Sequence, residues 1–228
     1  MLKLEHVVKH YQIGGGDPIR AIDGVSLTVE AGELVVIFGP SGSGKTTLLD
    51  LISGVRTPDG GRVIVDDRNV ADMSRREADA YRLRDLGIVD QADALFPGDR
   101  AIRNACLKLW LTNRRNAEAV VVPLLVRLGL GDRLDHPTEL LSKGERQRLS
   151  IARALALDPK IVLADEPTAN LDSRRTSEVL ELLRELCTER GTVTLLATHD
   201  KKAVAFADRA YELEDGRLRP LGNARGTG

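Results

Sequence analysis

Short runs of apolar residues recur along the chain and predict the strands of a parallel sheet. The runs lie at 34 to 38, 63 to 65, 86 to 89, 161 to 164 and 192 to 197. They lack the polar alternation of a half-solvated strand, which favours strands that are buried on both faces. Helical patterns separate many of them, notably at 44 to 53, 173 to 189 and 201 to 207. This alternation predicts an α/β fold with a mainly parallel sheet.

Two regions depart from the alternation. Residues 1 to 30, with the turn sequence GGGDP, predict short antiparallel strands near an edge, and DGGRVIVDD predicts a turn that leads into a strand. Residues 92 to 157 carry helical patterns at about 100 to 111, 116 to 128 and 143 to 157, and no strand pattern.

This organisation predicts a single domain with a discontinuous core. We expect residues 1–91 and 158–220 to form the core, with an N-terminal antiparallel β subdomain, and residues 92–157 to form an inserted α-helical subdomain. Residues 221–228 are expected to be a flexible tail, because terminal segments that pack nothing fray. A chain of 228 residues buries enough apolar surface to fold without disulfides or metals.

Composition narrows the class of protein. Charged residues make up 29% of the chain and give a net charge of −1, so we expect no nucleic-acid partner. Cys106 and Cys187 lack the spacing of a metal or redox motif, which favours buried reduced thiols in a cytoplasmic protein. The chain shows neither a signal-peptide pattern nor an apolar run near the roughly 18 residues of a membrane span. We expect a soluble chain that reaches a membrane only through a partner.

The sequence GPSGSGKT, at 39 to 46, lies between a strand pattern and a helical pattern. It fits the phosphate-binding pattern GxxxxGK[ST] in the context that this pattern requires, which argues against a glycine-rich turn with an incidental lysine. Backbone N–H groups of such a loop surround phosphate oxygens, Lys45 neutralises the β/γ end, and Thr46 coordinates Mg²⁺. The candidate nucleotide-binding residues are Gly39, Pro40, Ser41, Gly42, Ser43, Gly44, Lys45, Thr46 and Thr47.

Two carboxylates end another apolar run, in IVLADEP at 161 to 167. Asp165, at the strand end, is placed to bind Mg²⁺ directly or through water. Glu166 is then the group that orients or deprotonates a water molecule for attack on a γ-phosphate. An isolated acidic pair is as readily a solvated strand end, but the phosphate-binding loop favours the catalytic interpretation.

A histidine and a glutamine follow two further apolar runs. A lone histidine is more often structural, but His199 follows the run at 192 to 197, and ligands of α/β proteins bind at the carboxyl edge of the sheet. We therefore expect His199 to contact the γ-phosphate. Gln91 follows LGIVD and is a candidate for reaching Mg²⁺ or the attacking water.

The segment LLSKGERQRLSIARAL, at 140 to 155, permits two interpretations of its helix start. Ser142 and Glu145 have the spacing of a capping box, in which two side chains satisfy free N–H groups. Ser142, Lys143 and Gly144 would also give a helix N-terminus with a hydroxyl, an ammonium and an uncovered N–H, which is a site for an anion. The residues alone leave open which anion binds.

Taken together, these motifs resemble one protein family. The order GPSGSGKT, Gln91, LSKGERQR, VLADEPTANLD and ATHD is similar to that of the ATP-binding subunits of ATP-binding-cassette (ABC) transporters, over nearly the whole chain. The resemblance implies a P-loop NTPase core and an ATPase that uses ATP and Mg²⁺. It also implies a homodimer, in which the signature segment with Ser142, Gly144 and Glu145 closes over ATP held by a second copy of the chain.

The resemblance assigns roles to further residues. Tyr11, otherwise an amphipathic edge residue, matches the family's adenine-stacking aromatic residue. Gln91 matches the loop that couples the nucleotide site to the membrane subunits, and Asp172 matches a loop that crosses to the second subunit. Glu166 matches the catalytic carboxylate, and His199 matches the switch histidine.

One branch of the family is particularly similar. DEPTANLD, LGIVDQ and GPSGSGKTTLL resemble the branch that serves macrolide export, lipoprotein release and cell-division complexes. There the ATP-binding subunit is separate from an integral membrane permease, which implies a peripheral location at the inner face of the cell membrane. Export, or extraction of lipid, lipoprotein or peptide cargo, would follow. Asp90, the segment RNACLKLWL and Lys143, at the first glycine of the signature, depart from the usual pattern.

Two other classes of function share parts of the pattern. A soluble ABC ATPase, in cofactor assembly or in a cell-division regulatory complex, would share the motifs without a transported cargo. A P-loop kinase would share the phosphate-binding loop but not the residues at 141 to 148. Co-purification with a membrane protein would favour a transporter subunit over the first class, and phosphoryl transfer to a small acceptor would support the second.

Overall fold

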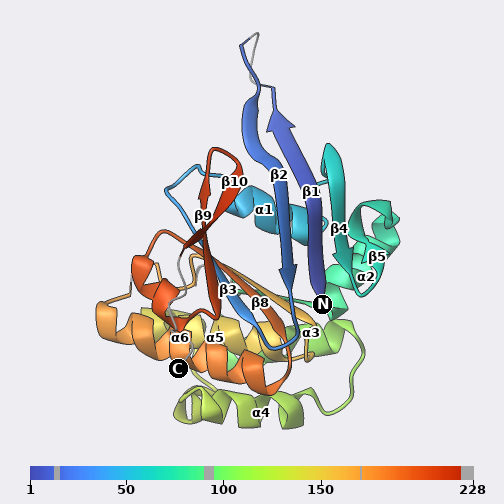
Figure 1. The fold of residues 1–228 in the computed structure, drawn as a ribbon. Helices are drawn as coiled ribbons and strands as arrows, with labels where there is room; N and C mark the ends of the chain where they lie inside the picture. Colours follow the sequence, from blue (N-terminus) through green and yellow to red (C-terminus); the bar gives the residue numbers. More distant parts are fainter. Residues whose placement is uncertain (13–15, 90–94, 170, 222–228) are drawn as a thin grey trace.

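Two β-sheets and the helices packed on them make up the fold (Figure 1). The computed structural model describes residues 1–12, 16–89, 95–169 and 171–221. Within these residues, the larger sheet contains β3 (Leu34–Phe38), β6 (Leu86–Val89), β7 (Ile161–Asp165), β8 (Val193–Thr198), β9 (Arg209–Glu214) and β10 (Arg217–Leu221). The smaller sheet contains β1 (Leu2–Tyr11), β2 (Ile19–Val29), β4 (Gly60–Val65) and β5 (Arg68–Asn69).

The larger sheet is mainly parallel. Its strands are ordered β10, β9, β3, β8, β7 and β6. Neighbouring strands from β9 to β6 run parallel, and β10 forms one edge as the antiparallel partner of β9. This arrangement confirms the predicted α/β fold, and it places the carboxyl ends of β3, β7 and β8 at the same edge of the sheet.

The smaller sheet is antiparallel, as predicted for the N-terminal strands, but it corrects the predicted length and position of these strands and the prediction for residues 63 to 65. Its strands are ordered β2, β1, β4 and β5, so the N-terminal strands form a sheet of their own, and β1 and β2 are long, with 10 and 11 residues. The apolar run at 63 to 65 belongs to β4 in this sheet, and its prediction as a parallel strand is wrong. Val63 and Val65 are buried but Ile64 is only partly buried, which is the alternation of a strand with one buried face.

The helices lie close to most of the predicted positions. They are α1 (Lys45–Ile52), α2 (Arg75–Arg84), α3 (Ala101–Leu111), α4 (Ala117–Arg127), α5 (Lys143–Leu155) and α6 (Ser173–Glu189), with short 3-10 helices η1 (Val70–Asp72), η3 (Gly131–Arg133), η4 (Thr138–Leu140) and η5 (Lys201–Phe206). α3, α4 and α5 occupy the segment that the sequence predicts to be helical. The division of the chain into subdomains stays a prediction.

Two of the helices differ from the sequence patterns. The segment at 201 to 207, predicted as a helix like the others, is the 3-10 helix η5, where the Asp200 side chain accepts the N–H of Lys202. α2 was not predicted, because Tyr81 is its one buried residue and its apolar periodicity is weak; the capping box of Ser74 and Glu77 was the available signal.

The sequence patterns do not predict the C-terminal strands β9 and β10 either, because only two residues of β9 and none of β10 are buried, so neither strand forms an apolar run. Leu221, assigned to the tail by the sequence, is the last residue of β10. The rest of the predicted tail, 222–228, lies outside the described residues.

β3 connects the two halves of the core. Leu34 and Val36 pack in a cluster with residues of α3, α4, α5 and α6, whereas Val35 and Ile37 pack with α1 and the smaller sheet. All four side chains are at most 1% exposed. Because successive side chains of a strand point to opposite faces, β3 is buried on both sides, which fixes the position of the loop that follows it.

The environment of the two cysteines and the character of the helices can be compared with what the composition predicts. Cys106 and Cys187 are buried and free, as predicted, and burial is the main cause that raises the pKa of each thiol to about 11. In the described parts of the chain, the helices are too short or too polar for any of them to cross a membrane.

A glycine pair in β4 provides a test of the contact between β1 and β4. Gly61 has φ of +77°, and an added Cβ would lie 2.3 Å from the carbonyl oxygen of His6. Gly60 has an ordinary φ, and its Cβ would lie 3.7 Å from Val8. We expect Gly61→Ala to lower the free energy of unfolding by about 2 kcal/mol or more, through backbone strain and collision.

Urea unfolding of Gly61→Ala and of its matched control Gly60→Ala measures this difference. The control should unfold close to the parent midpoint. Equal midpoints for the two variants would contradict the close approach of β1 and β4 at this position.

Candidate functional site

The predicted phosphate-binding loop connects the carboxyl end of β3 to the start of α1. The backbone N–H of Gly39 donates to the carbonyl of Thr198 at the end of β8, at 3.2 Å, so the loop starts at a fixed place in the sheet. Gly44, at the start of α1, has φ of +104°, and a Cβ there would lie 2.3 Å from the carbonyl oxygen of Ala21. The tight curl of the loop therefore requires glycine at this position.

Lys45 is buried beneath the loop. Its side chain is 7% exposed, and Nζ donates to the carbonyl oxygens of Gly39 at 2.8 Å and Pro40 at 3.0 Å. The Ser43 hydroxyl is also buried and has no hydrogen-bond partner in the described part of the chain. A buried hydroxyl without a partner and a buried cation beside a curled backbone fit a phosphate group.

Asp165 and Thr46 form a second part of the site. Asp165 is the last residue of β7, and its Oδ2 accepts a hydrogen bond from Thr46 Oγ1, in the first turn of α1, at 2.8 Å. Mg²⁺ takes oxygen ligands, often one or two from the protein with the rest from phosphate and water. The described residues contain no cluster of three or more His, Cys, Asp or Glu side chains for a metal. Thr46 and Asp165 supply two oxygen atoms, which fits a Mg²⁺ ion that takes its remaining ligands from a bound nucleotide and from water.

Glu166 is held by the ends of two neighbouring strands. Its φ of +48° is unusual for a residue with a side chain, and its N–H donates to Ala197 at 2.8 Å. One carboxylate oxygen, Oε2, accepts from Thr198 Oγ1 at 2.9 Å and from the N–H of His199 at 3.3 Å. The other, Oε1, lies 2.9 Å from His199 Nδ1 and 3.7 Å from Lys45 Nζ. The predicted catalytic carboxylate, histidine and lysine therefore meet in the structure.

A cleft of about 640 Å³ joins these groups to Tyr11. It is lined by Tyr11, Ile19, Ala21, Ser41, Gly42, Gly44, Lys45, Thr46, Thr47, Asp165 and Glu166. The Arg56 guanidinium and Lys9 Nζ lie 5.5 and 5.9 Å from the centre of the Tyr11 ring. An aromatic ring at one end of the cleft and a phosphate-binding loop at the other match the two ends of a nucleotide.

The signature segment lies outside this cleft. Ser142 is the N-cap of α5: its Oγ accepts from the N–H of Glu145 at 3.2 Å, and Glu145 Oε2 accepts from the N–H of Ser142 at 2.7 Å. The predicted capping box is thus present. Lys143 is exposed, and a Cβ on Gly144 would lie 3.7 Å from Cδ of Arg175.

Asp172 caps the neighbouring helix. Its Oδ1 accepts the N–H of Arg175 at the start of α6, at 3.0 Å. This backbone hydrogen bond is the main cause that lowers the pKa of Asp172. Because Arg175 also lies against Gly144, the two segments predicted to reach a second subunit begin side by side in one chain.

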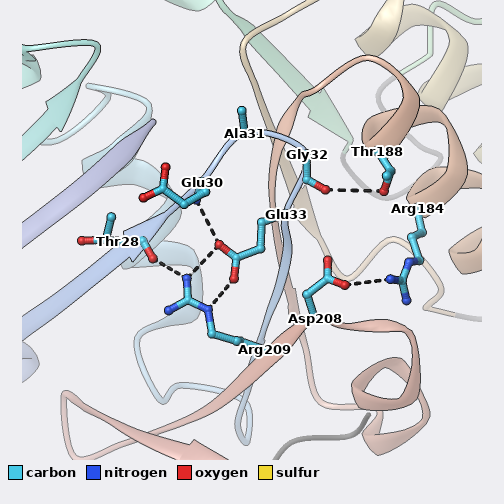
Figure 2. A pocket seen from close by; sticks show the side chains of 9 residues that line it. All are labelled: Thr28, Glu30, Ala31, Gly32, Glu33, Arg184, Thr188, Asp208 and Arg209. Carbon is cyan, nitrogen blue, oxygen red and sulfur yellow. Dashed lines mark hydrogen bonds and ion pairs between the residues drawn. The ribbon is translucent and has the colours of Figure 1, made fainter. Parts of the chain in front are cut away.

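A second hollow, of about 510 Å³, shares no lining residue with the cleft. Figure 2 shows the side chains that line it. Arg209 pairs with Glu33, with one N–O distance of 2.8 Å, and Arg184 pairs with Asp208 at 2.7 Å. Arg184 and Arg209 are therefore each neutralised by a carboxylate of this chain and are not left as unpaired cations for an anionic ligand. Its contacts join the connection between β2 and β3 to α6 and the start of β9.

Two residues with contacts in these sites do not stand out in the sequence, and one predicted site residue lies outside the part of the chain that the structure describes. Thr198, which bonds Glu166, and Arg133, which bonds Glu145, were not predicted. Thr198 stands at a strand end beside His199, which was a usable signal; no periodicity or motif indicated Arg133. Gln91 lies outside the described residues.

Comparison with known proteins identifies the family. A family model described as ABC transporter matches residues 22–169. The chain belongs to this family. Two relatives named as lipoprotein-releasing system ATP-binding proteins, LolD, are each 41% identical. The one from Chlorobaculum tepidum covers 97% of this chain and 93% of its own length, and the one from Shewanella frigidimarina covers 100% and 96%.

Solved structures of ABC cassettes have the same fold. A dimeric post-hydrolysis structure of the ATP-binding cassette MJ0796, bound to ADP and Pi, is 35% identical with a TM-score of 0.85, and it covers 99% of this chain and 100% of that one. As a member of the ABC family, this chain is an ATP-binding ATPase. The roles of its individual residues stay predictions, to which the distances above give a physical basis.

The capping box of the signature segment should make the free energy of unfolding depend on pH in the acid range. Burial raises the pKa of Glu145, but hydrogen bonds from the Ser142 backbone and from Arg133 outweigh it and lower this pKa from 4.5 to about 2. A depressed folded-state pKa stabilises the folded chain above pH 4.5, and the stabilisation is lost as the pH falls toward 2.

We expect Glu145→Gln to be less stable than the parent at about pH 6, with the difference in urea midpoint shrinking at about pH 3. Glu181→Gln, an exposed change of the same kind on α6, is the control for removing a charge. A pH-independent difference between Glu145→Gln and the parent would contradict the ionised capping box.

Proposed function

We propose that this chain is the ATP-hydrolysing subunit of a transporter that extracts or exports lipid-anchored cargo, such as lipoproteins, through a separate membrane permease. The main support for the ATPase role is that Tyr11, the phosphate-binding loop, Asp165 and Glu166 line one cleft. The cargo class is supported by the relatives named for lipoprotein release, which match this chain over nearly all of their own length. The chain would then lie peripherally at the inner face of the membrane.

The cleft suits ATP with Mg²⁺. Tyr11 would stack on the adenine, and the loop from Gly39 to Thr47 would surround the phosphates with N–H groups, while Lys45 neutralises the β/γ end. Thr46 and Asp165 would hold Mg²⁺, which supplies positive charge to the phosphate oxygens. The 2.8 Å bond between these two side chains supports a site of this kind.

Hydrolysis would depend on Glu166 and His199. Glu166 would orient a water molecule against the γ-phosphate and accept its proton, and Thr198 and the N–H of His199 fix the carboxylate for this role. The His199 side chain is 61% exposed, which leaves it accessible to a γ-phosphate at the mouth of the cleft. Gln91 would couple this site to the permease.

The site is completed by a second copy of the chain. Ser142, Gly144 and Asp172 stand apart from the chain's own cleft, at adjacent helix starts, which supports contacts made across a two-fold interface. The signature of one copy would close over the ATP of the other. The dimeric structures of the related cassette MJ0796 support this arrangement.

Glu166→Gln tests the ATPase role and the dimer together. Without the carboxylate, hydrolysis should slow by about 100-fold or more, and bound ATP should hold two chains together. Sedimentation with and without ATP and Mg²⁺ measures the oligomeric state, and Glu181→Gln serves as the control. A Glu166→Gln chain that stays monomeric at saturating ATP, or hydrolyses at the parent rate, would refute the mechanism.

Two exposed apolar side chains offer contacts for the permease. Phe96 and Leu140 are 53% and 73% exposed, and the Thr138 hydroxyl donates to the Phe96 carbonyl at 3.0 Å, which brings the two segments together. Phe96 follows the Gln91 segment in sequence and Leu140 precedes Ser142, so a partner that contacts both side chains would touch chain segments adjacent to both motifs.

Co-purification with a membrane protein encoded beside this chain tests the assignment. Phe96→Ser and Leu140→Ser should each reduce the recovered complex by about fivefold, because buried apolar contacts dominate such interfaces. Val55→Ser, at an apolar residue that is also exposed, at 61%, but lies in a different segment of the chain, is the control. Failure of the parent chain to bind any membrane protein would favour a soluble ABC ATPase instead.

A further inference from the structure

The capping box of α5 has a third member. While Oε2 of Glu145 accepts from the Ser142 backbone at 2.7 Å, Oε1 accepts from Arg133 Nε at 2.9 Å. The Glu145 side chain is 18% exposed and that of Arg133 is 44% exposed. Both carboxylate oxygens are therefore occupied within the chain, one of them by a cation from a different segment.

The segment that contains Arg133 is hydrogen-bonded to the start of α3. It ends η3, and the residues after it bind the start of α3: Leu134 accepts from the N–H of Ile102 at 2.9 Å, and His136 accepts from the N–H of Ala101 at 3.0 Å. Arg133 thereby joins the start of α5 to the start of α3. Arg146 adds a second support, because its side chain donates to the carbonyl of Leu141 at 2.7 Å.

A carboxylate at a helix start has opposite effects on folding and on anion binding. Glu145 stabilises α5 through the free N–H of Ser142 and the helix dipole. The same negative charge repels a second anion that approaches the helix start. In the proposed homodimer this second anion is the γ-phosphate of ATP held by the other copy, so the charge of Glu145 has to be offset nearby.

We infer that Arg133 is a positioning residue for the shared ATP site, which holds Glu145 in the capping box and offsets its charge so that the start of α5 accepts the partner's γ-phosphate. The inference rests on the proposed homodimer. This role distinguishes the ion pair of Arg133 and Glu145 from the many exposed ion pairs of the chain, which contribute little to the free energy of unfolding. A purely structural Arg133 would contribute to folding but would leave the response to ATP unchanged.

The test compares charge variants in the Glu166→Gln background. Arg133→Gln should weaken ATP-dependent dimerisation by about tenfold, because it leaves the Glu145 charge without its counterion beside the incoming phosphate. Adding Glu145→Gln should bring the affinity back to within about threefold of Glu145→Gln alone, since Gln keeps the capping geometry without the charge. The loss in Arg133→Gln should also shrink as salt is raised.

Arg100→Gln is the matched control. Arg100 pairs with Asp135 at 3.0 Å, in the same contact between the η3 segment and α3, but it does not touch the signature. It should leave dimerisation unchanged, and thermal unfolding checks the folding of every variant.

The outcomes separate this inference from the proposed function. If Glu166→Gln itself fails to dimerise with ATP, the homodimer and the role of Arg133 both fail. If it dimerises, and Arg133→Gln dimerises equally well or is not rescued by Glu145→Gln, the role of Arg133 alone is overturned.

Discussion

The register of the parallel sheet is the constraint on which the nucleotide site depends. Phe38 of β3 pairs with Thr198 of β8, and Asp165 of β7 pairs with Ala197 of β8. The loop after β3 and the side chain of Glu166 therefore emerge at one edge, within reach of each other. A slip of one residue would exchange the side chains of β3 that pack in the two core clusters, so the packing of both clusters fixes the site as well as the core.

The same arrangement concentrates polar groups where the core ends. Lys45 is buried, which is tolerable because two loop carbonyls accept its hydrogen bonds and Glu166 lies 3.7 Å away. Glu166 occupies an unfavourable backbone conformation that the neighbouring strand holds in place. The surrounding sheet thus positions the carboxylate before any ligand binds, which is the preorganisation that its proposed catalytic role requires.

The sequence predicts the parts of the fold and site that have strong local patterns. Strands buried on both faces, such as β3, and the glycine loop before Lys45 are recognisable without tertiary information. β4 was misplaced because three apolar residues do not reveal whether one face or two are covered. Arg133 was missed because its bond to Glu145 joins segments that only tertiary packing brings together, and an exposed arginine carries no signal of its partner. The ABC family was recognisable because five separated motifs of the chain occur in the order that is typical of that family.

In the proposed homodimer, the signature of one copy faces the ATP cleft of another. The native thiols Cys106 and Cys187 are buried, so introduced cysteines can report this contact. Mixing a Ser41→Cys chain with a Ser142→Cys chain under mild oxidation tests it directly. The account predicts a disulfide-linked dimer that forms with ATP and exceeds the background of either variant alone; no ATP-dependent cross-link above that background would contradict it.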